Sequence, residues 1–445
     1  MSDIEIQPAP TLPVDHRPID NKTAMAAVQN SLGKRYRAER RFRAFGIASI
    51  CIALTLLVVL FWTIISSAIP AFTETSLDLE ITLPADDLDP DGTGDPVVIG
   101  NGNFPKYVKQ AMYSLFPDVT KRKDKKKLAK LASPGAAFML REHALSNPSS
   151  IGTTFVLRVP VSDDIDQFAK GNITADISEA NRRISNKQIA WFQTLTDQGL
   201  VHRSFNSTFF TSGDSREPEL AGIWGAVVGS VFTMIVTLAF AFPIGVASAV
   251  YLEEFAKKSR LSGIIEVNIN NLAAVPSIVY GLLGLAVFLN FFGFPRSAPL
   301  VGGMVLALMT LPTVIIASRA SLKAVPPSIR EAALGLGASK AQTVAHHVVP
   351  LALPGMLTGA IIGMARALGE TAPLLMIGMV AFIVDFPDTF TDPATVLPVQ
   401  IYLWADAPER GFIERSSATT LVLLCFLIVM NGLAVILRKR FERRW

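Results

Sequence analysis

Six long apolar runs constrain the fold of this chain more than any other feature. Half of the residues are hydrophobic and only 18% are charged, which is too apolar for an ordinary soluble protein. A helix needs about 20 apolar residues to cross the hydrocarbon core of a bilayer. The sequence therefore predicts an all-α polytopic membrane protein with six transmembrane helices. The apolar runs cover about residues 44–69, 221–251, 264–292, 298–318, 352–384 and 416–437.

The positions of the basic residues predict the topology. The total of 41 Lys and Arg against 37 Asp and Glu is too balanced to indicate nucleic-acid binding, but six of the basic residues stand between 34 and 43, directly before the first run. Basic flanks stay on the cytoplasmic side, so both termini are expected there. The predicted parts are a cytoplasmic basic tail (1–43), transmembrane helix 1 (44–69), a periplasmic soluble domain (70–219), a transmembrane core (220–437) with a cytoplasmic loop (319–350), and a cytoplasmic tail (438–445).

The segment 70–219 has no apolar run of membrane length and is expected to be an inserted α/β or α+β domain. Phe155, Leu157, Val159 and Val161 alternate with other residues as in a half-buried strand, and 178–200 has the pattern of an amphipathic helix that stops near Gly199. The basic run that starts at Lys121 is expected to be a solvated face.

The cytoplasmic loop contains EAALGLGASKAQTVAHHVVP, which begins at Glu331. This pattern predicts a short helix, an interruption at Gly335 and Gly337, and a second helix that ends before Pro350. The glycines would let the backbone of another protein approach closely. Adjacent residues on a helix point about 100° apart, so the neighbouring histidines at 346 and 347 are not expected to share a metal. The chain also has no G-x-x-x-x-G-K-[ST] sequence, so no cofactor and no ATP site of that kind are expected in it.

Two charged residues, Arg366 and Glu370, stand deep inside the fifth apolar run. A charge at the centre of a membrane helix costs about 2.5–3.5 kcal/mol or more unless it is paired or hydrated. Their four-residue spacing would place both on one helix face, where they could neutralise each other. One hypothesis is an ion pair that only fixes helix packing. The other is a substrate site in which the planar fork of Arg366 binds an oxyanion and Glu370 holds the guanidinium between substrates.

The sequences RALGETAPLL, VPSIVYGLLGL and FPIGVASAVYLEEFA, together with the Glu-Ala-Ala loop, resemble the PstA permease subunits of phosphate-specific type I ABC importers. The resemblance covers about 219–445, and the inserted domain lies outside the usual pattern. Val349 and His347 depart from the usual end of the loop motif. The resemblance implies a non-enzymatic permease that moves inorganic phosphate across the bacterial inner membrane. Its implied partners are a PstC-like permease, a PstB-like ATPase dimer that carries ATP and Mg, and a PstS-like periplasmic phosphate-binding protein.

The resemblance also implies two groups of functional residues. The expected substrate pathway contains Arg366, Glu370, Thr371 and Arg319. The expected ATPase-coupling loop contains Glu331, Ala332, Ala333, Gly335, Gly337 and Pro350. Two alternatives remain open from the sequence: an importer for another oxyanion, such as phosphonate, molybdate or sulfate, and a membrane-anchored sensor that uses the inserted domain.

Overall fold

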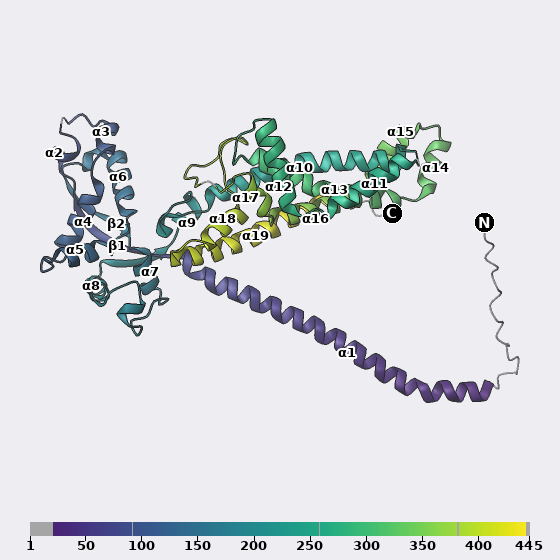
Figure 1. Cartoon of the computed structure of the whole chain (residues 1–445), viewed down its shortest axis with the longest axis horizontal. Coiled ribbons are helices and arrows are strands. Elements are labelled where there is room, and N and C mark those ends of the chain that lie inside the picture. Colours follow the sequence, from purple (N-terminus) through teal and green to yellow (C-terminus); the bar gives the residue numbers. More distant parts are fainter. Residues whose placement is uncertain (1–20, 91, 258, 381, 442–445) are drawn as a thin grey trace, which may run out of the picture. The chain divides into compact units, whose positions relative to one another are not determined.

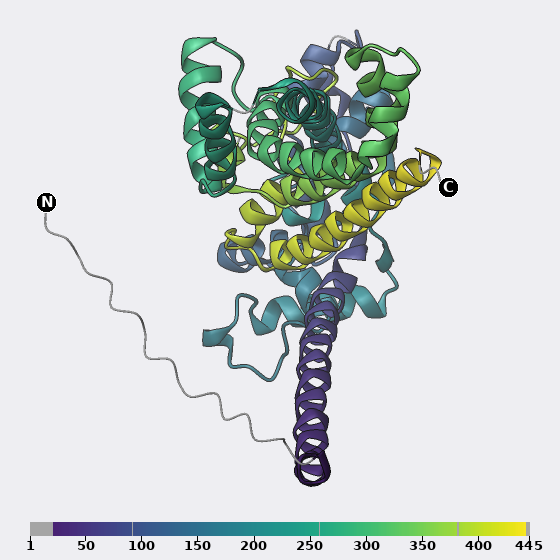
Figure 2. The same ribbon diagram turned by 90° about the vertical axis from the view of Figure 1, so that its right-hand side faces the viewer.

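A computed structural model describes residues 21–90, 92–257, 259–380 and 382–441 (Figures 1 and 2). The chain divides into two compact units, residues 1–63 and 64–445. The first unit is built by most of helix α1, which spans Asn21–Ala68. This helix starts upstream of the transmembrane segment expected from residue 44, so the basic flank is helical as well. Residues 1–20 and 442–445, which belong to the two predicted cytoplasmic tails, lie outside the described residues.

The inserted domain contains a three-stranded antiparallel sheet with strand order β2-β1-β3. Its strands are β1 (Thr73–Thr82), β2 (Thr154–Pro160) and β3 (Val201–Phe205). Leu77 of β1 pairs with Val159 of β2, and both side chains are fully buried in the domain core. The alternation that predicted a strand around Val159 is therefore confirmed, because every second side chain of a strand faces the core.

Short helices cover this sheet and give the domain an α+β architecture. The predicted helix over 178–200 is too long, because α8 spans only Asn186–Asp197. The side chain of Gln188 accepts a hydrogen bond from the backbone N–H of Ser185 and so fixes the start of α8. The other helices are α2 (Ala85–Leu88), α3 (Pro96–Gly100), α4 (Phe104–Ser114), α5 (Arg122–Ala129), α6 (Ala136–Ser146), α7 (Asp163–Ala169) and α9 (Thr208–Thr211).

Within the described residues, five helical segments are long and apolar enough to cross a membrane, and a bent pair brings the number to six. The bent pair is Arg260–Ala273 followed by Ser277–Phe291, with an angle of 102° at the break beside Pro276. The main membrane helices are α10 (Trp224–Val250), α11 (Arg260–Ala273), α12 (Ser277–Gly284), α13 (Pro299–Ala324), α16 (Val349–Leu368) and α19 (Arg410–Phe441).

The fifth apolar run does not form one helix over 352–384. Helix α16 ends at Leu368, and a separate short helix, α17 (Ala372–Met376), follows it. Pro373 explains the interruption, because proline cannot donate the hydrogen bond that a continuous helix would need at that position. Proline is tolerated in the first turn of a new helix, where Pro373 lies. The chain then crosses a loop and continues in α18 (Leu397–Ala405).

The prediction that the second loop helix ends before Pro350 is wrong. Helix α14 spans Pro327–Gly335, Gly337 turns the chain with a φ of 89°, and α15 begins at Lys340. A π-helical turn over Val344–Val348 then joins α15 to α16, so one helical segment runs from Lys340 to Leu368. Pro350 lies in the first turn of α16, and the wider π turn before it accommodates its missing N–H donor.

Candidate functional site

The charged residues of the fifth span lie where α16 ends. The backbone N–H of Glu370 donates to the carbonyl of Ala367 at 3.2 Å, so Glu370 follows the last helical turn directly. Its Oε1 atom lies 3.6 Å from Nε of Arg366. The structure therefore places the two side chains at ion-pair distance, with Arg366 in the helix and Glu370 in the break.

The exposure of this pair is unequal. The side chain of Arg366 is 53% exposed in the isolated chain, whereas that of Glu370 is 20% exposed. A separation of 3.6 Å is longer than a hydrogen bond, and a guanidinium carries five N–H donors. Arg366 can therefore offer donors to an oxyanion while it remains close to Glu370. A charge in this position of a membrane protein must face water or another protein, because lipid cannot solvate it.

A second broken span lies against this break. Gly281 of α12 packs so closely on α17 that a Cβ atom there would lie 2.7 Å from Cα of Pro373. The neighbouring Tyr280 donates its hydroxyl to the carbonyl of Leu272 in α11 at 2.7 Å and so connects the two arms of the bent pair. Thr371 begins α17, since its carbonyl accepts the N–H of Leu375 at 3.0 Å. The break in the fifth span is thus held by the bend of another span, an arrangement found in transporters with discontinuous helices.

Arg319 does not lie with Arg366. It belongs to α13, where its Nη1 lies 3.1 Å from Glu266 and its Nε lies 3.4 Å from Glu253. Helices α13 and α16 run antiparallel, because Gly355 packs on Ser321 and Gly359 packs on Ala317. Arg319 is therefore level with about residue 357, roughly 13 Å along α16 from Arg366. The structure separates it from the charged break.

The helical loop after α13 is anchored by a residue that the sequence did not single out. Arg330 of α14 lies 2.7 Å from Glu254 through Nη2 and donates from Nη1 to the carbonyl of Val325 at 2.7 Å. The acidic pair in YLEEFA was the available signal, since two carboxylates directly after an apolar run require cationic partners. The anchored loop presents Leu334, 50% exposed, and Leu336, 90% exposed, at its tip.

The expected coupling residues are divided along this loop. Ala333 is buried, whereas Glu331, Ala332, Gly335 and Gly337 are exposed. Pro350 lies further along, inside the continuous helix that leads to Arg366. The exposed members thus surround the apolar tip, while Pro350 belongs to the connection between the tip and the charged break.

These features define a multi-pass permease: a bundle of membrane helices with a charged break and an exposed helical loop. Residues 241–445 match the family described as the inner membrane component of binding-protein-dependent transport systems, and residues 29–179 match a domain of unknown function. The phosphate transport system permease protein PstA 1 of Mycobacterium tuberculosis (strain H37Rv) is 33% identical over 244 residues, which are 55% of this chain and 78% of the relative. PstA of Haemophilus influenzae is 30% identical over 242 residues, or 54% and 82% of the two chains.

The chain belongs to the PstA family of ABC-importer permeases. The predicted fold class, a polytopic type I ABC permease with an inserted α+β domain, is confirmed. Among solved structures, a chain of the MetNI methionine ABC transporter is 17% identical, with a TM-score of 0.40. The match covers 50% of this chain and 98% of the MetNI chain.

Proposed function

We propose that this chain is the pore-forming subunit of an ATP-driven importer that moves inorganic phosphate across the bacterial inner membrane. The observation that supports this most directly is the half-exposed guanidinium of Arg366 at the break of a membrane helix. Relatives with 30–33% identity carry the name phosphate transport system permease. The name and the chemistry agree, because an arginine fork donates two parallel hydrogen bonds to a phosphate group.

The roles of the two charged residues follow from their geometry. Phosphate near neutral pH is a mixture of the monoanion and the dianion, and Arg366 would offset its charge where few water molecules remain. Glu370 would pair with the guanidinium when no substrate is bound. Its negative charge would repel a phosphate ion that had moved beyond Arg366. Thr371, which is half-buried beside Glu370, adds a hydroxyl to the same segment. Arg319, with its two carboxylate partners, would instead connect the inner end of α13 to α11 and to the turn that follows α10.

The proposed topology places the helical loop in the cytoplasm and the inserted domain in the periplasm. The helical loop and the inserted domain lie towards opposite ends of α19. Arg438, near its C-terminal end, contacts Thr358 in the half of α16 that follows the loop, whereas Glu414, near its start, contacts Lys170 of the inserted domain. The basic residues at the end of α19 fit a cytoplasmic C-terminus.

The partners that we propose follow from this arrangement. The exposed apolar tip with Leu336 would dock on a PstB-like ATPase dimer, which would bind ATP and Mg and perform the hydrolysis. A PstC-like permease would complete the pore, and a PstS-like periplasmic protein would deliver phosphate. No cofactor is assigned to this chain.

Uptake of labelled phosphate, normalised to the amount of permease in the membrane, tests the proposal in cells without other phosphate importers. Arg366→Gln should reduce uptake at least tenfold at near-normal abundance. The double variant Arg366→Gln with Glu370→Gln leaves no unpaired charge and should be abundant but still inactive. Arg296→Gln, which removes a cation from a short loop, is the matched control.

Two outcomes would contradict the assignment. Wild-type uptake by the double variant would show that the pair serves only helix packing. Competition by sulfate, molybdate or a phosphonate as effective as competition by unlabelled phosphate would favour an importer for another oxyanion, because an arginine fork alone does not separate these substrates.

A further inference from the structure

A cavity of about 1220 Å³ lies in the inserted domain, outside the membrane helices. Its lining includes residues of α4, α5 and the segment 179–185, together with Glu217–Glu219 and Glu409. This volume is somewhat larger than the roughly 300–1,000 Å³ that small-molecule sites usually provide. The cavity is separate from the charged break at Arg366, and neither the proposed transport step nor the coupling loop uses it.

Cationic side chains from three parts of the domain converge on this cavity. Arg122 and Lys126 are one helical turn apart and therefore share a face of α5, and Lys130 continues that face. Lys109 comes from α4, and Arg182 and Arg183 come from the segment before α8. The basic run is exposed, as the sequence predicted, but one face of it lines a concavity rather than open surface.

The acidic residues around the cavity offset only part of this charge. Glu179 and Asp164 are near Lys127 and Arg183, at 3.9 and 4.0 Å. Burial raises the pKa of Glu219 to about 7, so this carboxyl is only partly ionised at neutral pH, whereas Asp163, whose pKa burial raises to about 6, keeps most of its negative charge. The positive charge that remains is concentrated on the α5 wall.

One guanidinium at the cavity is fixed but incompletely bonded. Nη1 of Arg182 donates to the carbonyl of Ala175 at 2.9 Å, and Nη2 contacts the side chain of Asn186. The Nε atom of the same residue is buried and has no hydrogen-bond partner among the described residues. A buried donor without an acceptor is unfavourable, so this guanidinium has a donor that its surroundings leave unsatisfied.

We propose that this cavity binds an anion that carries more than one phosphoryl charge. A single phosphate ion would fill little of the volume and could not reach cations on three separate elements, whereas a diphosphate or a phosphate ester could. The ligand could come from solution or from a lipid headgroup, because Glu409 directly precedes the membrane helix α19 and Glu219 lies five residues before α10. This inference is independent of the transport assignment, since binding is measured without transport.

Calorimetric titration of the full-length chain in nanodiscs of neutral lipid tests this proposal, with pyrophosphate as the probe. Pyrophosphate should bind with a stoichiometry of one, and higher salt should weaken binding. The double variant Arg122→Gln with Lys126→Gln should weaken it at least tenfold. The control is Lys121→Gln with Lys123→Gln, which removes the same charge from side chains outside the cavity lining and should change affinity less than twofold.

Absence of pyrophosphate binding, or equal weakening in both double variants, would overturn the proposal. Equally tight binding of citrate, a multivalent anion without phosphorus, would overturn the ligand class. Nanodiscs that contain cardiolipin, whose headgroup carries two phosphates, distinguish the sources: competition with pyrophosphate would support a lipid headgroup as the ligand, and unchanged affinity would support a soluble one. Unaltered thermal unfolding of both variants verifies that they are folded.

Discussion

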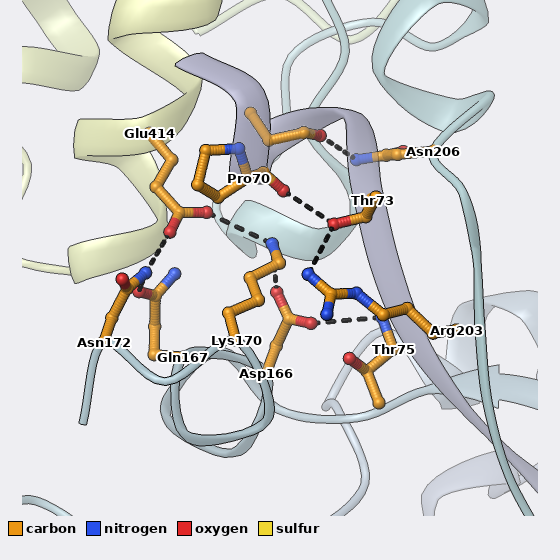
Figure 3. Close-up of polar contacts among 11 residues, drawn as sticks. Pro70, Thr73, Thr75, Asp166, Gln167, Lys170, Asn172, Arg203, Asn206 and Glu414 are labelled. Carbon is orange, nitrogen blue, oxygen red and sulfur yellow. Dashed lines mark hydrogen bonds and ion pairs between the residues drawn. The ribbon is translucent and has the colours of Figure 1, made fainter. Parts of the chain in front are cut away.

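The ion network around Lys170 gives a prediction with a defined magnitude. The Lys170 side chain is 5% exposed, and its Nζ lies 2.6 Å from Asp166 and 3.1 Å from Glu414 (Figure 3). Asp166 also accepts the backbone N–H of Thr75 at 3.1 Å, and Glu414 accepts the side-chain amide of Asn172. This network joins α7 of the inserted domain to α19 of the membrane core.

Replacing Lys170 with methionine would leave two largely buried carboxylates without their cation. Breaking a buried ion pair from one side costs about 3–5 kcal/mol. For a domain of 150–250 residues, each kcal/mol lowers Tm by about 2–4 °C, so Tm should fall by about 6–20 °C. Adding Asp166→Asn and Glu414→Gln removes the uncompensated charges and keeps acceptors for Thr75 and Asn172. This triple variant should recover most of the loss.

Thermal unfolding of the purified chain in detergent, followed by tryptophan fluorescence, measures these changes. Lys187→Met is the matched control, since Lys187 lies 2.6 Å from Asp124 but is 57% exposed. An exposed pair contributes about 0–1 kcal/mol, so the control should move Tm only slightly. If Lys170→Met lowered Tm no more than Lys187→Met, burial of the network would not be the source of its strength.

Three further predictions concern other parts of the chain. Gly337→Asp should abolish co-purification of the ATPase subunit while the permease stays in the membrane. The reason is that φ is 89° at this exposed tip, a value that only glycine adopts readily. If the variant still bound the ATPase and transported phosphate, the loop would not be the coupling element. Gly281→Ala should lower phosphate uptake, because the added Cβ would displace α17 and destabilise the packing by roughly 1–3 kcal/mol. Gly263→Ala is the control: no atom lies within 4 Å of the added Cβ, so this variant should behave as wild type. An alkaline phosphatase fusion at Asn181 should be active and one at the C-terminus inactive; the reverse pattern would refute the topology.

Local patterns in the sequence predicted the features that depend on local physics. Hydropathy located the membrane helices, because a span must be apolar along its whole length, and alternation around Val159 located β2. The four-residue spacing correctly predicted that Arg366 lies near Glu370, but the two do not share a helix face, because α16 ends at Leu368. Hydropathy did not reveal the break at 369–371, since the apolar run over 352–384 continues on both sides of these three residues.

Features that depend on distant contacts could not be predicted in this way. Lys170 and Glu414 are 244 residues apart, and neither stands in a distinctive pattern. The separation of Arg319 from Arg366 depends on the antiparallel packing of α13 and α16. The end expected before Pro350 was wrong because a proline signal is ambiguous: the same residue can stop a helix or lie in its first turn, and the preceding π turn decided the outcome.

The continuous helix from Lys340 to Leu368 has a mechanical consequence. Arg366 lies 26 residues after Lys340, or roughly 39 Å along the helix axis. Tilting a rod of that length by about 5° about one end displaces the other end by roughly 3 Å, since the displacement is the product of length and angle. Glu370 moves with Arg366, because its backbone N–H is bonded to Ala367 in the last turn of the same helix. A rotation of a few degrees at the loop is therefore enough to shift the whole ion pair by about the distance between its two charged groups, without any unfolding of the segment between them.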